Sequence, residues 1–215
     1  MKDLKIVANK PANTQVSNTR TNSKSKILRI STSRIALLGL SLGLLIIAKW
    51  RFFLDLPGTE IITGLFIIFA IVFSFLECIL LIVAFNLLVL EMYGFGTWWV
   101  AYWWIWIIDV TFIKLGYKLF ARGTISLMFS ALFLGFSINI DYFFSDLIFF
   151  NLPYAIVDSI SGLITNVIEG VVNSFFIMIA SKRLLLLFWN HNFYNPKCQK
   201  YFLTNKDLQL QENII

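Results

Sequence analysis

Charged residues are scarce in this sequence. Asp, Glu, Lys and Arg make up 14% of the 215 residues, whereas 58% are hydrophobic. Soluble globular domains carry about 25% charged residues, so a water-soluble domain is excluded. The apolar runs also lack the strict alternation of apolar and polar residues that is typical of transmembrane strands. We therefore expect an all-α membrane protein whose spans are helices.

Residues that carry covalent chemistry are equally scarce. The two cysteines, Cys78 in an apolar run and Cys198 in a polar tail, are expected at different depths and predict no disulfide framework. The only histidine, His191, lies in a basic tail. We find no metal-ligand cluster, nucleophile elbow or phosphate-binding loop. We therefore expect no metal, no cofactor and no catalysis, and active transport would need energy from a partner or an ion gradient.

Basic residues are distributed unevenly along the chain. The net charge is +6, but in a membrane protein the position of Lys and Arg reports orientation, so a nucleic-acid partner is not expected. Residues 1–29 are predicted to be a disordered, basic cytoplasmic tail, 30–189 a membrane domain, and 190–215 a cytoplasmic C-terminal tail. This arrangement puts every base inside except Lys49 and Arg51. It predicts a multi-pass protein of the cell membrane with six spans and both termini in the cytoplasm.

Hydrophobic runs give the six predicted spans. They are 35–50, two short helices within 61–90 that turn near 74–77, then 98–113, 124–140 and 162–189. The run 61–90 is divided because thirty helical residues would rise roughly 45 Å, well beyond the hydrocarbon layer. Segment 141–161 is too apolar for an ordinary loop. We interpret it as an extension of the fifth helix followed by a cap over the outer mouth.

The first span carries a stripe of small residues, Ala36, Gly39 and Gly43. Small residues let a second helix approach closely where lipid removes the hydrophobic driving force for association. The partner helix could belong to another protein or to this chain, and the sequence leaves both open.

An aromatic motif, Tyr93-Gly94-Phe95-Gly96-Thr97-Trp98-Trp99, opens the fourth span. Five tryptophans occur among the nine residues 98–106. Trp98, Tyr102, Trp106 and Asp109 share one face of the predicted helix. One interpretation is a belt at the membrane interface, where Trp and Tyr are common. The other is an inward-facing wall, which the acid on the same stripe favours.

The last span carries Asn166, Glu169 and Asn173 at i, i+3 and i+7, on one helix face. An ionisable group in lipid is costly, so this face is expected to look into a polar space. The amides could form hydrogen bonds between helices. A carboxylate between two amides, which offer both donors and acceptors, is more suggestive of a ligand site.

Two segments carry a resemblance to a known family. Residues 56–60, Leu-Pro-Gly-Thr-Glu, and residues 93–102 are similar to segments of uncharacterised substrate-binding S components of energy-coupling factor (ECF) transporters. The resemblance implies a vitamin or similar micronutrient captured from outside, a transmembrane coupling protein and two ABC-type ATPases. The family's first helix offers Ala-x-x-x-Ala to the coupling protein. Here Leu40 follows Ala36 by four residues, and the small residues shift to Gly39 and Gly43.

These observations combine into one site hypothesis. The aromatic residues Trp98, Tyr102 and Trp106 would enclose a planar or ring-containing ligand. The polar residues Asn166, Glu169 and Asn173 would orient it, and Phe95 and Glu60 could close the outer mouth. Two rivals remain: an intramembrane lipid-modifying enzyme with Asp109 and Glu169 as acid and base, and a structural subunit of a membrane complex.

Overall fold

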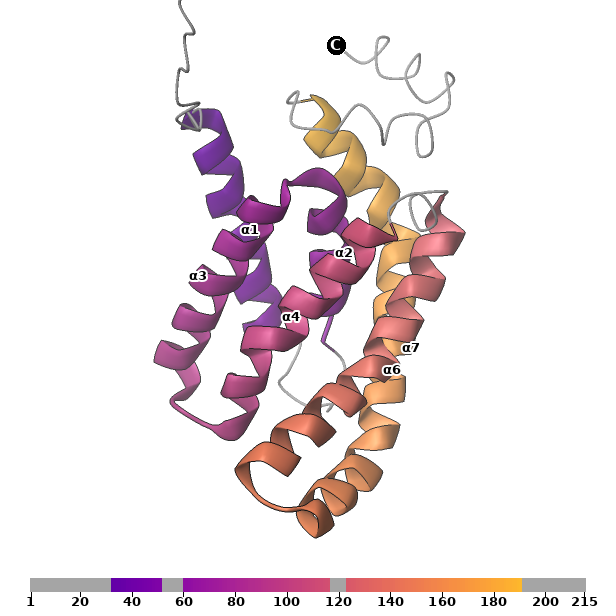
Figure 1. Ribbon diagram of the computed structural model, residues 1–215. Coiled ribbons are helices and arrows are strands. Elements are labelled where there is room, and N and C mark those ends of the chain that lie inside the picture. The colour runs from indigo at the N-terminus through magenta and orange to yellow at the C-terminus, as the bar shows by residue number, and fades with distance from the viewer. Residues whose placement is uncertain (1–31, 52–59, 117–122, 191–215) are drawn as a thin grey trace, which may run out of the picture. The chain divides into compact units, whose positions relative to one another are not determined.

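The computed structural model describes residues 32–51, 60–116 and 123–190, and all regular structure in these ranges is helical (Figure 1). The predicted N-terminal tail, residues 191–215 of the predicted C-terminal tail and residues 56–59 of the segment similar to S components lie outside the described residues. The helices are α1 (Thr32–Arg51), α2 (Ile62–Val72), α3 (Phe75–Tyr93), α4 (Thr97–Leu115), α6 (Thr124–Phe149) and α7 (Leu152–Asn190).

Four of these helices, α1, α3, α6 and α7, are long and apolar enough to cross a membrane. Helix α2 is apolar but has 11 residues, and it rises only about 16 Å, roughly half the hydrocarbon thickness. Helix α4 begins and ends within two residues of the predicted fourth span. The expectation of an all-helical membrane-spanning protein is therefore confirmed, while the six-span count and the orientation of the termini stay predictions.

A short break separates α2 from α3, where the sequence predicts a turn. Ser74 caps α3 by accepting a hydrogen bond from the backbone N–H of Glu77, and the Glu77 carboxylate accepts one from the backbone N–H of Ser74 at 2.8 Å. This reciprocal capping box starts the new helix. Arg34 of α1 forms an ion pair with the same carboxylate. The acid that interrupts the apolar run thus caps the start of α3 and joins it to α1.

Helices α6 and α7 form a hairpin with a two-residue connection (Figure 1). The expected extension of the fifth helix is confirmed, because α6 continues to Phe149. The expected cap is not a separate segment, because residues 152–161 are the first turns of α7. Asn151 explains the restart: its side-chain oxygen accepts a hydrogen bond from the backbone N–H of Tyr154 at 2.9 Å, as an N-cap does. We call the end of the helices that includes this connection the hairpin end.

Two glycines allow α6 and α7 to cross closely. A Cβ atom added to Gly135 would lie 2.3 Å from the Cα atom of Gly170. Near this crossing the Ser174 hydroxyl donates to the carbonyl of Met128 at 2.8 Å. Small residues and hydrogen bonds of this kind hold helices together where lipid surrounds them.

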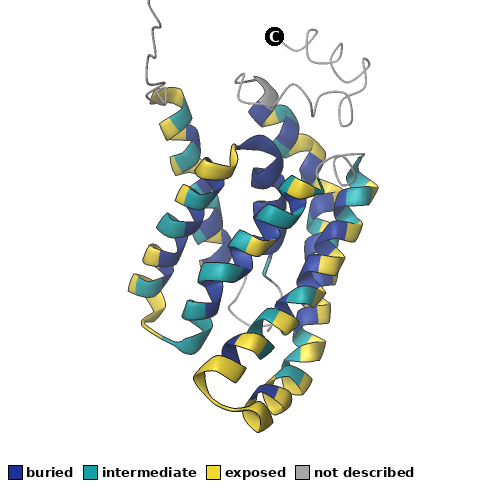
Figure 2. Cartoon of the chain, in the orientation of Figure 1, coloured by how far each residue is buried: buried dark blue, intermediate teal, exposed yellow. Residues whose placement is uncertain are grey.

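Helix α2 forms the centre of the packing. All of its residues are buried (Figure 2), and it contacts α1, α3, α4, α6 and α7. Phe66 stacks on Trp106 of α4 with 5.1 Å between ring centroids and meets the edge of Phe85 of α3 at 5.9 Å. The N-terminal end of this buried helix faces the hairpin end, and the candidate site lies there.

Candidate functional site

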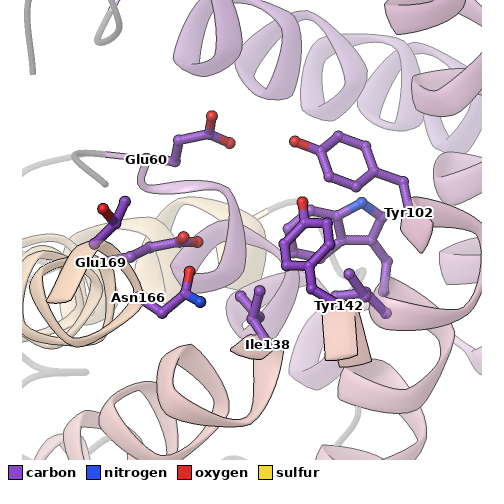
Figure 3. A pocket seen from close by; sticks show the side chains of 9 residues that line it. Glu60, Tyr102, Ile138, Tyr142, Asn166 and Glu169 are labelled. Carbon is purple, nitrogen blue, oxygen red and sulfur yellow. The ribbon is translucent and has the colours of Figure 1, made fainter. Parts of the chain in front are cut away.

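A cavity of about 180 Å³ lies between the N-terminal end of α2 and the helices α4, α6 and α7 (Figure 3). We call it the central cavity. Its lining comprises Glu60, just before α2; Tyr102, Ile105 and Trp106 of α4; Ile138 and Tyr142 of α6; and Thr165, Asn166 and Glu169 of α7. The polar ends of Glu60, Tyr102, Tyr142, Asn166 and Glu169 surround a common space (Figure 3). An apolar helix bundle thus encloses a polar site.

The aromatic stripe of α4 forms one wall. Tyr102 and Trp106 are 6% and 2% exposed, and their rings meet edge to face at 5.4 Å. Trp98 packs against Tyr102 at the same centroid distance but is only half-buried and does not line the central cavity. A belt at the membrane interface does not account for rings that are buried inside the protein. Interior packing does account for them.

Asp109 continues this stripe but does not reach the cavity. It is 1% exposed, and neither carboxylate oxygen has a hydrogen-bond partner among the described residues. Since Glu169 lines the central cavity and Asp109 does not, the cavity does not bring together the acid and base of the lipid-modifying enzyme considered above.

The polar face of α7 divides into two parts. Asn166 donates to the side chain of Asn139 at 2.9 Å, and Glu169 accepts from the Thr63 hydroxyl at 3.3 Å. Both residues are 8% exposed and both line the central cavity. Glu169 has no cationic partner within ion-pair distance among the described residues.

Asn173, the third residue of this face, is fully buried and lies outside the cavity lining. Its side-chain oxygen accepts from the backbone N–H of Gly64 at 2.6 Å. Its amide nitrogen donates to the carbonyls of Glu60 at 2.6 Å and Glu169 at 2.9 Å. For Asn173 the structure therefore fits the alternative that the amides of α7 form hydrogen bonds between helices. Both polar atoms of its amide already have hydrogen-bond partners within the protein. Asn173 positions both cavity carboxylates through their backbones.

Lys49 is part of the site, although its sequence position suggested only an outer-loop charge. Its ammonium donates to the Glu60 carboxylate at 2.6 Å and to the Tyr102 hydroxyl at 2.9 Å. It also lies 5.2 Å from the centre of the Tyr102 ring. Lys49 is 9% exposed. Sequence reasoning missed it because nothing in the local pattern shows that the end of α1 meets α4.

Two further cavities adjoin the central one. The Lys49 cavity, about 420 Å³, is lined by Lys49, Tyr93, Trp98 and Tyr102. The hairpin cavity is about 290 Å³ and shares Tyr142, Thr165 and Asn166 with the central cavity. Its other lining residues come from the start of α4 and from the hairpin: Thr97, Trp98, Asn139, Asp146, Tyr154, Asp158 and Gly162. Trp98 therefore belongs to the two neighbouring cavities.

Phe95 does not close any of these cavities. Its side chain is 75% exposed and its ring packs against Trp99 at 5.6 Å between centroids. Glu60 lines the central cavity and binds Lys49 of the adjoining one, and its closing of the outer mouth stays a prediction.

The sequence reasoning also missed Thr63, Asn139, Tyr142 and Thr165. Helical spacing could have indicated three of them, because Asn139 and Tyr142 are three residues apart on α6 and Thr165 precedes Glu169 by four residues on α7. Thr63 is the only polar side chain of α2 and gave no such signal.

The small-residue stripe of α1 has open space beside it. Nothing lies within 4 Å of a Cβ atom added to Gly39 or Gly43, and Ala36 and Gly39 are exposed. The stripe therefore does not pack against another helix of the described chain.

Comparison with protein-family models gives no match, and comparisons with curated proteins and with solved structures give none either. The case for a function consequently depends on the geometry of the cavity and of the α1 surface.

Proposed function

We propose that this chain is the substrate-binding subunit of an ECF-type importer. It would capture a vitamin or related micronutrient from outside through the hairpin end and hold it in the central cavity. Transport energy would come from two ABC-type ATPases, joined through a transmembrane coupling protein. In this proposal α4 is a further span and α2 is a short sixth span, covered on its sides by the five helices that it contacts. Both termini lie in the cytoplasm.

The observation that carries the proposal is the central cavity itself. A buried carboxylate inside an apolar helix bundle is costly, and such groups usually mark a ligand or ion pathway. Here Glu169 and Asn166 line a cavity beside two buried aromatic rings. Concave sites with a few convergent polar groups among apolar and aromatic residues are typical of small-molecule binding.

The open face of α1 supports the second half of the proposal. Ala36, Gly39 and Gly43 present a surface with little side-chain bulk, and Ile35 and Leu40 beside them are exposed at 58% and 55%. A helix of another membrane protein could approach this face closely. The coupling protein would dock there.

A two-part experiment tests both halves. The full-length chain is purified in mild detergent from the cells that naturally make it, and mass spectrometry identifies the proteins and small molecules that remain bound. We expect a micronutrient and two ATPases with the wild-type protein. Leucine at both Gly39 and Gly43 should remove the ATPases and leave the small molecule, whereas alanine at both positions, the matched control, should retain both.

The second candidate function is that of a structural subunit of a membrane complex, since the open α1 face could equally well bind a permanent partner subunit. It predicts stable co-purification of proteins other than ATPases and an empty cavity. Wild-type protein that carries neither an ATPase nor a small molecule contradicts the importer proposal.

A further inference from the structure

We propose that the ligand of the central cavity is a small organic cation, an ammonium compound with a single positive charge. Its charge would pair with Glu169, and its alkyl groups would lie against the rings of Tyr102 and Trp106. This inference rests on the proposed function and names the substrate class of the same site.

The charge of the lining residues is the first argument. Glu60 and Glu169 line the central cavity, and Asp146 and Asp158 line the adjoining hairpin cavity. Among the described residues, no Lys or Arg lines either of these two cavities. Clefts lined by one sign of charge concentrate ligands of the opposite sign. Lys49 pairs with Glu60, but the other carboxylates along this route would repel an anion.

Lys49 provides the second argument, because its ammonium already occupies part of this environment. The ammonium nitrogen lies 2.6 Å from a Glu60 oxygen, and 5.2 Å and 6.0 Å from the ring centres of Tyr102 and Tyr93. A carboxylate beside aromatic rings within about 6 Å is the arrangement that attracts ammonium groups. The Lys49 ammonium thus already makes the contacts, a carboxylate and aromatic rings, that an ammonium ligand would make.

The ion pair also sets the charge of the ligand. Lys49 neutralises Glu60, whereas Glu169 accepts one hydrogen bond from a neutral hydroxyl and has no cation within ion-pair distance among the described residues. Glu169 is therefore the carboxyl group with which a cationic ligand would pair, in place of a proton. A ligand with a single positive charge can pair with Glu169. A second positive charge on the ligand would find no unpaired carboxylate on the lining of the central cavity.

The size of the cavity limits the ligand further. About 180 Å³ is smaller than the roughly 300–1,000 Å³ of pockets that enclose drug-sized molecules. Tyr102, Trp106 and Tyr142 supply rings on the α4 and α6 sides. A compact ammonium compound fits this space, and a large multi-ring cofactor does not.

Equilibrium dialysis on the purified full-length protein tests the inference with defined probes. The probes are choline, ethanolamine and tetramethylammonium, and 3,3-dimethylbutan-1-ol serves as the uncharged analogue of choline. We expect saturable binding of at least one ammonium probe and no competition by the uncharged alcohol. If none of the three ammonium probes binds, or if the alcohol competes as well as choline does, the inference is overturned.

Glu169→Gln tests the residue assignment, and Glu91→Gln is its matched control, since Glu91 is an exposed carboxylate of α3 outside the three cavities. Loss of one charge-assisted contact should weaken binding of the ammonium probe about tenfold or more. The control should bind like the wild type. Equal binding by Glu169→Gln and wild type would overturn the assignment.

The molecule that accompanies the protein from its own cells separates this inference from the proposed function. A bound neutral or anionic molecule together with ATPases would contradict the proposal of a cationic ligand and would still support the proposal of an importer. A bound ammonium compound without ATPases would support the proposal of a cationic ligand and would contradict the proposal of an importer.

Discussion

Two pairs of glycines in this chain have opposite surroundings. Gly39 and Gly43 of α1 lie beside open space, whereas Gly135 of α6 and Gly170 of α7 place two backbones in contact. Both pairs occur in long apolar helices. The small residues of α6 and α7 therefore let two helices of this chain pack closely, whereas those of α1 leave an open surface. The same substitution, glycine to alanine, can measure this contrast.

The largest effect is expected from Gly135→Ala. The added Cβ atom would lie 2.3 Å from the Gly170 Cα atom and 2.7 Å from its backbone nitrogen, and backbone atoms cannot move aside as a side chain can. Overpacking of this kind typically costs about 1–3 kcal/mol or more in the free energy of unfolding, and we expect the upper end. Thermal unfolding in detergent measures it. An unchanged unfolding temperature would show that α6 and α7 do not cross here.

A smaller loss is expected from Gly64→Ala, at the contact between α2 and α7. Its Cβ atom would meet a ring carbon of Phe176 at 2.7 Å and the side-chain oxygen of Asn173 at 3.0 Å. Because side chains can shift partway, we expect a loss of about 1–2 kcal/mol in the free energy of unfolding. Asn173 also donates hydrogen bonds to the backbone carbonyls of Glu60 and Glu169. A shift of Asn173 should therefore displace these two residues and weaken binding of the ammonium probe. Reduced stability with unchanged binding would contradict this linkage.

The smallest effect, and one of opposite sign, is expected from Gly39→Ala and Gly43→Ala. Neither Cβ atom meets a neighbour within 4 Å, and alanine stabilises a helix interior by about 0.5–1 kcal/mol relative to glycine. The unfolding temperature of the isolated protein should stay constant or rise slightly. A clear fall would show that these glycines pack within the chain.

Parts of the site followed from the sequence because they depend on local geometry. Tyr102 and Trp106 share a helix face one turn apart, so their common burial follows from the helical repeat. Asn166 and Glu169 share a face of α7 for the same reason. The break at Ser74 followed from the length of the apolar run and the acid three residues later.

Other parts could not be predicted, because they depend on which helices meet. Lys49 looked like a loop charge until the end of α1 was placed beside Glu60 and Tyr102. Asn173 has the same spacing and chemistry as its neighbours on α7, yet it binds backbone groups near α2 instead of facing the cavity. Phe95, chosen for its place in a glycine-rich motif, is 75% exposed.

By itself the sequence determined the class of the protein, its helices and the faces that carry aromatic and polar groups, because apolar content and the helical repeat act over short distances. Only the tertiary structure decided which polar groups face a cavity, which are satisfied by neighbouring backbones and which glycines touch another helix. These outcomes depend on contacts between residues far apart in the chain. The 109 positions that separate Gly64 from Asn173 leave no local signal of their hydrogen bond.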